Sequence, residues 1–156
     1  MKTLVAYFSA SGTTRRVAES LAAATGSGLY EIRPAQPYTA SDLNWQNKNS
    51  RSSLEMNGLA PDPALADQKA PVAEYERIFL GFPIWWYTAP TVIHSFLKSY
   101  DFSGKEIVLF ATSGGSGLGR TASELAAICP GAKVIDGRLF NGRPTREELK
   151  AWAESV

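Results

Sequence analysis

The sequence has very few of the side chains that bind metals or form disulfides. Cys129 is its only cysteine and His94 its only histidine. One cysteine excludes an internal disulfide, a four-cysteine iron–sulfur cluster and a thiol-rich zinc site. One histidine argues against a histidine-based metal site and against a Ser-His-Asp triad. We expect Cys129, which precedes Pro130, to be a small buried residue and His94 to be a structural residue of a helix, so difficult chemistry would have to come from a cofactor.

Excess charge and long apolar segments are also missing. The 16 lysines and arginines are balanced by 15 aspartates and glutamates, so nothing favours nucleic acid or an anionic membrane as a partner. No apolar run is long enough to cross a bilayer, and we expect the first strand to follow Met1 and Lys2 without a signal peptide. We therefore expect a cytoplasmic protein with a single domain over residues 1–156, which is long enough to bury a core.

What is present is an alternation of apolar runs and amphipathic segments. Helical spacing of Val17, Ala18, Leu21 and Ala22 follows the first apolar run and ends near residues 25–26. Such an alternation predicts an α/β fold, with a parallel sheet between two layers of helices. Strands are expected at residues 3–8, 28–33, 76–83, 107–111 and 132–137.

The helix boundaries and one long connection are read from local signals. Thr88 is expected to cap the helix after the third strand, with Pro90 in its first turn. Thr145 and Glu148 have capping-box spacing at the start of the last helix. Residues 38–70 are longer than an ordinary connection and carry weak helical spacing over 42–58. They form either a poorly packed surface loop or a partly helical flap that reaches the ligand or a partner chain.

The loop after the first strand has the composition of a phosphate-binding turn. A buried strand that leads into a helix through a short hydroxyl-rich turn leaves backbone N–H groups unpaired at the positive end of the helix dipole. One glycine permits a tight turn and close approach of a ligand. The alternative is an ordinary loop in which Ser or Thr caps the helix. Neither a P-loop ending nor a G-x-G-x-x-G fingerprint is present. The loop consists of Ser9, Ala10, Ser11, Gly12, Thr13 and Thr14.

Two further loops are expected at the same edge of the sheet, because the carboxyl ends of parallel strands lie together. The aromatic rings after the third strand either pack under the 38–70 segment or stack on a flat ligand or partner. The glycine-rich segment after the fourth strand is either a flexible linker or a source of backbone donors. These loops contain Pro83, Ile84, Trp85 and Trp86, and Thr112, Ser113, Gly114, Gly115, Ser116 and Gly117.

Taken together, these motifs resemble the flavodoxin family over essentially the whole chain, in a short-chain bacterial flavodoxin-like branch. The resemblance implies a three-layer, doubly wound fold with a five-stranded sheet in the order 2-1-3-4-5, and flavin mononucleotide (FMN) as cofactor. It further implies that residues 9–14 bind the phosphate and that residues 83–86 and 112–117 contact the flavin ring. Two departures from the family are the near-neutral charge, where flavodoxins are typically acidic, and Arg15 and Arg16 beside the phosphate loop.

The resemblance implies electron transfer through non-covalently bound FMN, with a protein redox partner or a small-molecule electron acceptor. The alternative is an NAD(P)H-dependent flavin or quinone reductase. Such enzymes often complete their site from a second subunit, which would make the chain a homodimer, and Asn44, Trp45, Arg51 and Glu55 could then cap the site. A more remote alternative is a non-redox binding module on the same fold. A receiver-like phosphate acceptor is disfavoured, because the first and third strands end without carboxylates.

Overall fold

The computed structural model describes residues 2–112 and 118–156 of the chain. Strands and helices alternate along it, as the sequence predicts, with one short 3₁₀ turn at Val72–Glu74. The strands are β1 (Thr3–Tyr7), β2 (Gly28–Glu31), β3 (Arg77–Pro83), β4 (Glu106–Thr112) and β5 (Lys133–Leu139), and the helices are α1 (Thr13–Thr25), α2 (Arg51–Met56), α3 (Thr91–Ser99), α4 (Thr121–Ile128) and α5 (Arg146–Ser155).

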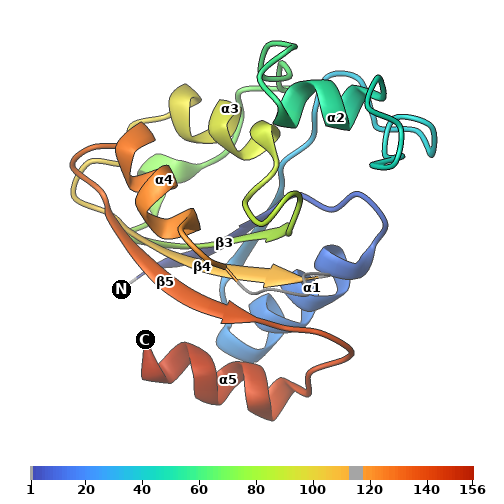
Figure 1. Cartoon of the computed structure of the whole chain (residues 1–156). Helices are drawn as coiled ribbons and strands as arrows, with labels where there is room; N and C mark the ends of the chain where they lie inside the picture. The colour runs from blue at the N-terminus through green and yellow to red at the C-terminus, as the bar shows by residue number, and fades with distance from the viewer. Residues whose placement is uncertain (1, 113–117) are drawn as a thin grey trace.

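The five strands form one parallel sheet in the order β2-β1-β3-β4-β5. This order confirms the predicted flavodoxin-like α/β topology. In Figure 1 the carboxyl ends of β4 and β5 point to the right, where α1 begins. Because strand order reverses beside β1, the loops after β1, β3 and β4 meet at this edge, which is where ligands bind in such sheets.

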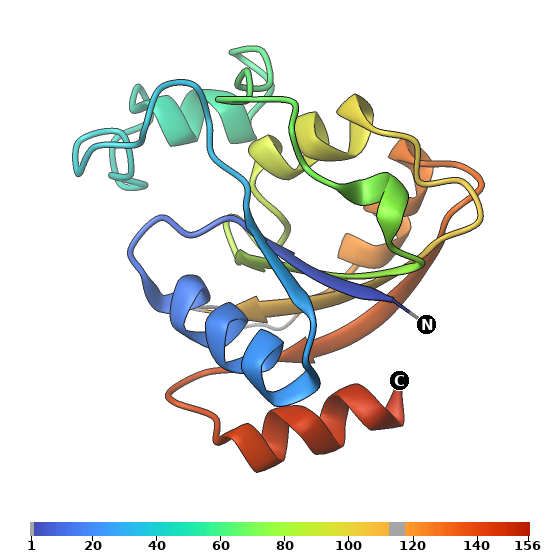
Figure 2. The ribbon, with the colours of Figure 1, turned by 180° about the vertical axis from the view of Figure 1, so that it is seen from behind.

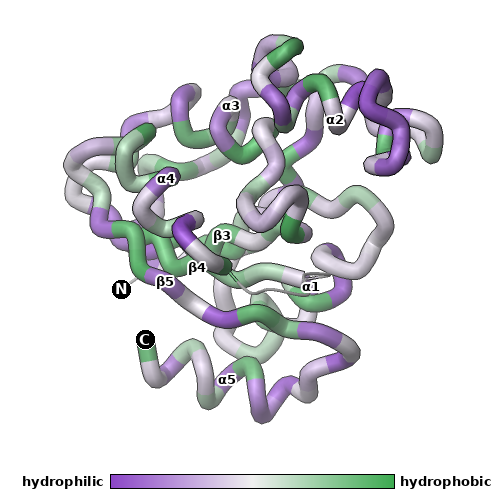
Figure 3. Tube along the Cα trace, viewed as in Figure 1, coloured by the Kyte–Doolittle hydropathy of each residue, from purple (hydrophilic) through white to green (hydrophobic). Residues whose placement is uncertain are grey.

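Alternation along β1 divides the core between the two faces of the sheet. Leu4, Ala6 and Phe8 pack in one core with residues of α3 and α4. Val5 and Tyr7 pack in the other core with residues of α1 and α5. Figures 1 and 2 show these two helical layers on opposite sides of the sheet. In Figure 3 the central strands are largely hydrophobic, as strands buried on both faces must be.

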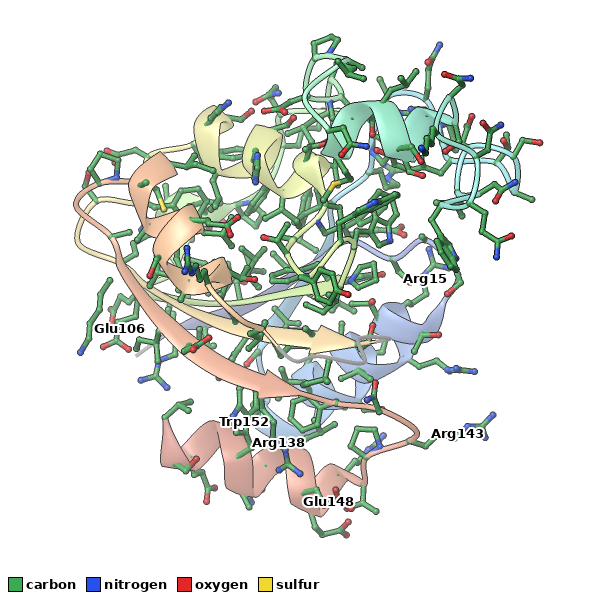
Figure 4. All side chains as sticks on the ribbon, viewed as in Figure 1. Arg15, Glu106, Arg138, Arg143, Glu148 and Trp152 are labelled. Atoms are coloured by element: carbon green, nitrogen blue, oxygen red, sulfur yellow. The ribbon has the colours of Figure 1, made fainter. Side chains whose placement is uncertain are left out.

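One close approach between neighbouring strands requires glycine. A Cβ atom on Gly137 in β5 would lie 1.6 Å from the carbonyl oxygen of Leu109 in β4. The β4–β5 register also shifts between Val108 and Phe110. Trp152 of α5 lies below this region, and its ring packs on Phe79, Phe110 and Phe140 (Figure 4). The absence of a side chain at Gly137 therefore allows β5 to lie close both to β4 and to Trp152 of α5.

The helix starts agree with the sequence in one case and differ in another. Thr145 caps α5 as predicted, with its Oγ1 accepting a hydrogen bond of 3.1 Å from the Glu148 amide. The prediction for α3 is wrong. Pro90 precedes the helix in an extended conformation rather than occupying its first turn. Thr88 is not its cap, because the Thr88 hydroxyl donates instead to the Glu124 carboxylate at 2.9 Å.

The long segment between β2 and β3 is folded. Its only α-helix among the described residues is α2, which is shorter than the predicted 42–58 pattern, and Ser52, Ser53 and Glu55 of this helix are buried. The two ends of the segment pair with each other. The Ala35 amide donates to the Ala64 carbonyl at 2.7 Å, and the Ala66 amide to the Arg33 carbonyl at 2.8 Å. We refer to residues 36–63, which lie between these paired ends, as the excursion.

Across residues 2–112 and 118–156, no helix has the length and hydrophobicity that a membrane span requires.

Candidate functional site

The loop between β1 and α1 presents unpaired amide groups at the start of a helix. The chain turns at Gly12, whose φ of 95° lies in the left-handed region that favours glycine. The first intrahelical bond joins the Arg16 amide to the Gly12 carbonyl. Among the described residues, no side chain caps this end of α1, and its first turn contains no acidic residue. The first amides of α1 are thus available to an external acceptor, and the helix dipole favours an anion there.

The hydroxyl groups of this loop have different roles. Ser9 Oγ accepts a bond of 3.0 Å from the Gly12 amide, so it shapes the turn. The oxygens of Ser11 and Thr13 lie 3.5 Å apart at the surface. Thr14 is buried, and its Oγ1 lies 2.8 Å from Oγ1 of Thr112 at the end of β4. Thr14 therefore joins the first loop to the base of the third loop instead of facing the solvent, whereas Ser11 and Thr13 can face a ligand.

The loop after β3 is a tight hairpin. Trp85 and Thr88 exchange two backbone hydrogen bonds of 2.9 and 3.0 Å, and the two residues between them have positive φ, 47° at Trp86 and 66° at Tyr87. This is the pattern of a type I′ turn, which Asn and Gly adopt most readily. Trp86 is 37% exposed and Tyr87 74% exposed. The hairpin thus holds large aromatic side chains at the surface, on a backbone that is strained for them.

The second and third loops are held together by backbone contacts. The Ile84 amide donates to the Thr112 carbonyl at 3.0 Å. A Cβ atom on Gly119, beyond the third loop, would lie 3.6 Å from the Tyr87 carbonyl oxygen. The two ends of the third loop thus both lie beside the hairpin. Ser113, Gly114, Gly115, Ser116 and Gly117, which the sequence assigns to this site, lie outside the described residues.

Behind the hairpin, Trp85 belongs to a cluster of three aromatic rings. Its ring meets Tyr38 edge-to-face at 5.3 Å and Phe8 at 5.7 Å, and the rings of Phe8 and Tyr38 lie 5.8 Å apart. For Trp85, the structure shows packing against the 38–70 segment, whereas stacking on a ligand or partner stays a prediction. Trp85 packs under the excursion through Tyr38, while Trp86 remains at the surface.

Sequence reasoning missed Phe8 and Tyr38 as parts of this site. The sequence pattern predicts Phe8 only as a strand end and Tyr38 only as the start of the 38–70 segment. Tyr38 donates from its hydroxyl to the Glu55 carboxylate of α2. Burial and this carboxylate raise the pKa of Tyr38 far above its usual range, so its hydroxyl stays protonated. The only signal in the sequence was an aromatic residue directly after Pro37, which does not reveal a contact with Trp85.

A cavity of about 460 Å³ lies beside this cluster. Its wall combines Phe8 and Tyr38 with the ends of β1 and β2 and the paired segment after β2. Arg15, at the start of α1 (Figure 4), forms an ion pair with Glu31 at this cavity. Arg16 instead lines a second cleft of about 440 Å³ together with Thr13 and Arg143. Arg15 and Arg16 thus lie on different sides of α1.

Of the two rare side chains, Cys129 is buried as predicted, and His94 lies in a helix, α3, as predicted. Cys129 is buried and its Sγ contacts the Leu125 carbonyl at 3.2 Å, and burial raises the pKa of its thiol. His94 has a lowered pKa because burial disfavours its charged form. Among the described residues, no group of three His, Cys, Asp or Glu side chains could hold a metal ion.

The sequence was compared with models of known protein families. The family model that matches is described as flavodoxin, and the match covers residues 2–156. The chain belongs to the flavodoxin family. No curated protein matches the chain.

Solved structures of similar fold include proteins designated as flavoproteins. One from Bacteroides eggerthii is 47% identical, with a TM-score of 0.92, and the match covers 99% of this chain and 97% of that chain. One from Bacteroides uniformis is 49% identical, with a TM-score of 0.91, and the match covers 98% of this chain and 97% of that one. A flavoprotein from Lactobacillus acidophilus, solved in complex with FMN, shares the flavodoxin fold at 24% identity and a TM-score of 0.73, with coverage of 97% and 98%.

Proposed function

We propose that this chain binds FMN non-covalently and transfers electrons through it. The observation that carries the proposal is the meeting of an uncapped helix end, an aromatic hairpin and the end of β4 at one edge of the sheet. The family of the chain and the FMN complex of a protein with the same fold support it. Bound FMN would supply the redox chemistry, and the protein would supply binding, orientation and the electrostatic environment.

The first loop fits the phosphate group of FMN. A Cβ atom on Gly12 would meet nothing within 4 Å, so the space above this turn is open. By contrast, α2 and α5 each have a serine or threonine side chain that accepts a first-turn amide. The start of α1 would offer its amides and the hydroxyls of Ser11 and Thr13 to the phosphate. The loop contains no lysine, so phosphate binding would depend on backbone donors and the helix dipole.

The hairpin and the third loop would hold the flavin ring. Trp86 and Ile84 would cover one face of the ring, while Trp85 supports the hairpin from behind. Residues 113–117 would supply backbone donors to the polar edge of the ring. Apolar cover disfavours added negative charge on the ring, whereas nearby donors stabilise it, so these two loops would set the reduction potential in opposite directions.

The first experiment measures FMN binding by the purified protein and by Gly12→Val. Wild-type protein should be yellow, or become so when FMN is added to the apoprotein. In the variant, the branched side chain would block the approach of the phosphate and strain the turn. Losing one or two hydrogen bonds to a charged group should weaken FMN affinity about 10- to 100-fold.

Gly104→Val is the matched control. Gly104 also has a positive φ, 76°, with open space at its Cβ position, but it lies at the opposite edge of the sheet. It should carry a similar backbone strain and leave FMN affinity unchanged. A colourless wild-type protein that FMN does not reconstitute would contradict the proposal, as would equal FMN affinities in the two variants.

A second candidate function is an NAD(P)H-dependent flavin or quinone reductase. The cavity of about 460 Å³ beside Phe8 and Tyr38 favours it, because this volume is within the range of small-molecule sites. Anaerobic mixing of the FMN-loaded protein with NADPH and a quinone separates the two functions. Rapid loss of the oxidised flavin absorbance, with turnover of the quinone, indicates the reductase. Absence of bleaching leaves the chain as a carrier between redox partners.

A further inference from the structure

A buried carboxylate in the excursion is shared by two side chains. Glu55 of α2 is 6% exposed. Its Oε2 accepts a bond of 3.0 Å from Arg51 Nε, and its Oε1 accepts the hydroxyl of Tyr38. A carboxylate at this depth is retained only when its oxygens are paired. Glu55 therefore fixes Arg51 and Tyr38 relative to each other.

The Arg51 guanidinium covers the Tyr38 ring. Its central carbon lies 4.0 Å from the ring centroid, and its Nη1 donates to the Gln36 carbonyl at 2.8 Å. The planar guanidinium thus uses its face for the ring and its edge for hydrogen bonds, a combination that lysine cannot reproduce. Tyr38 is held from one side by Arg51 and at its hydroxyl by Glu55.

The helix that carries these groups has its own anchors. Ser50 caps α2 by accepting the Ser53 amide, and Ser53 Oγ donates to the Asn47 carbonyl at 2.8 Å. Ser50, Ser52 and Ser53 are all buried. A helix of one to two turns is not stable by itself, so these contacts are needed to keep Arg51 and Glu55 in place.

The Tyr38 ring also meets the hairpin residue Trp85, with an interplanar angle of 89°. Phe8, at the end of β1, completes the contact with both rings. Tyr38 is thus the link between α2 and the loop that carries the exposed Trp86. Moving Tyr38 would remove one of the two rings against which Trp85 packs.

We propose that Arg51 and Glu55 are positioning residues that hold Tyr38 against Trp85 and so set the position of the hairpin that faces the flavin ring. This inference rests on the proposed function. The excursion then acts on flavin binding through Tyr38, without Arg51 or Glu55 having to touch the cofactor.

The test compares FMN affinity and the visible circular dichroism of bound FMN in Arg51→Met, Arg51→Lys, Tyr38→Leu and Tyr38→Phe. Loss of the ring, or of the guanidinium that holds it, should weaken FMN binding about 3- to 10-fold, the equivalent of one edge-to-face aromatic contact. Either loss should also change the visible circular dichroism spectrum of bound FMN, which depends on the environment of the flavin ring. Arg51→Lys should behave like Arg51→Met. Tyr38→Phe keeps the ring but removes the hydroxyl bond to Glu55, so it should show a smaller change in the same direction.

Matched controls separate positioning from general destabilisation. Arg77→Met removes a comparably buried arginine, paired with Glu106 at the far edge of the sheet. Tyr100→Leu removes a tyrosine that packs on Phe96 and Phe102. Both should leave FMN affinity and the visible spectrum unchanged. Arg51→Met leaves the buried Glu55 carboxylate without its ion-pair partner and could therefore fail to fold. In that case, the double variant Arg51→Met/Glu55→Gln, which also removes the Glu55 charge, takes the place of the single variant in the test.

Wild-type affinity and an unchanged visible spectrum in folded Arg51→Met and Tyr38→Leu would overturn the inference. If the wild-type protein binds no FMN, that result would instead contradict the proposed function. The contact itself is then judged from the near-ultraviolet circular dichroism of the apoprotein. A difference between wild type and Arg51→Lys supports the positioning of Tyr38 against Trp85, and identical spectra overturn it.

Discussion

The hydroxyl oxygens of Thr14 and Thr112 lie 2.8 Å apart in the interior, although the two residues are 98 positions apart in the chain. Thr14 is in the first turn of α1, and Thr112 ends β4. Both side chains are buried. This single hydrogen bond joins the loop predicted to bind the phosphate to the base of the loop predicted to contact the flavin ring.

Removing one hydroxyl group of this pair should destabilise the fold more than removing both hydroxyl groups. Thr14→Val leaves the Thr112 hydroxyl buried without a partner, which should lower the free energy of unfolding by about 1–3 kcal/mol. The double variant Thr14→Val/Thr112→Val replaces both hydroxyls with methyl groups and should recover most of that loss. Urea unfolding of the two single variants and the double variant checks this, and additive losses would contradict it.

The hairpin after β3 should become more stable when its strain is relieved. Tyr87 has a φ of 66° and is largely exposed, so its side chain contributes little packing. Tyr87→Gly should raise the free energy of unfolding by about 0.5–1 kcal/mol, because glycine adopts this conformation without a Cβ clash. Trp45→Gly is the control, since Trp45 is 68% exposed but is not in the left-handed region. It should give no gain, and a loss of stability in Tyr87→Gly would contradict the prediction.

A side chain at position 137 should disrupt the β4–β5 pairing. The added Cβ of Gly137→Ala would overlap the Leu109 carbonyl oxygen, so the strands would have to separate. We expect a loss of about 3 kcal/mol or more in the free energy of unfolding. Gly104→Ala, which meets open space at a positive φ, should lose only about 1–2 kcal/mol. Equal losses in thermal or urea unfolding would contradict this assignment.

Asp67 should make stability depend on acid pH. Hydrogen bonds from the Tyr30 hydroxyl, 2.6 Å, and from the Lys69 amide lower the pKa of Asp67 in the folded protein. The carboxylate therefore stabilises the fold above the unfolded pKa, about 4, and this contribution is lost as the pH falls through the lower folded value. The stability difference between wild type and Asp67→Asn should be larger at about pH 6 than at about pH 3.

Tyr30→Phe provides the control for Asp67. It removes the principal donor to the carboxylate, so the pKa of Asp67 should move back toward its usual value and the pH dependence should weaken. A stability difference between wild type and Asp67→Asn that does not change with pH would show that the carboxylate does not depend on these hydrogen bonds.

The sheet could be predicted because its information is local. Each strand is an apolar run bounded by turn residues, and alternation with helices then restricts the topology to a few parallel arrangements. The error at Pro90 has a tertiary cause. The hairpin bonds between Trp85 and Thr88 and the Thr88–Glu124 contact determine where the chain enters α3, and none of them is visible in the local sequence.

The candidate site was predicted in part for the same reason. Gly12 and the surrounding hydroxyl residues predict a turn before a helix, and in the structure an uncapped helix begins there. The role of Tyr38 depends on a ring contact across 47 positions of the chain, between residues 38 and 85. No hydrophobic period or turn signal encodes such a contact. The binding roles assigned to residues 9–14, 83–86 and 112–117 stay predictions.

The paired ends of the excursion have a consequence for protein engineering. Ala35 and Ala64 are joined by a backbone hydrogen bond, so residues 36–63 leave and re-enter the fold at nearly one point. A short turn grafted between these two alanines would delete Tyr38, Arg51 and Glu55 together while retaining every strand of the sheet. Exchangeable inserts at this position would allow residues 36–63 to be replaced as one unit, without changing the loop between β1 and α1.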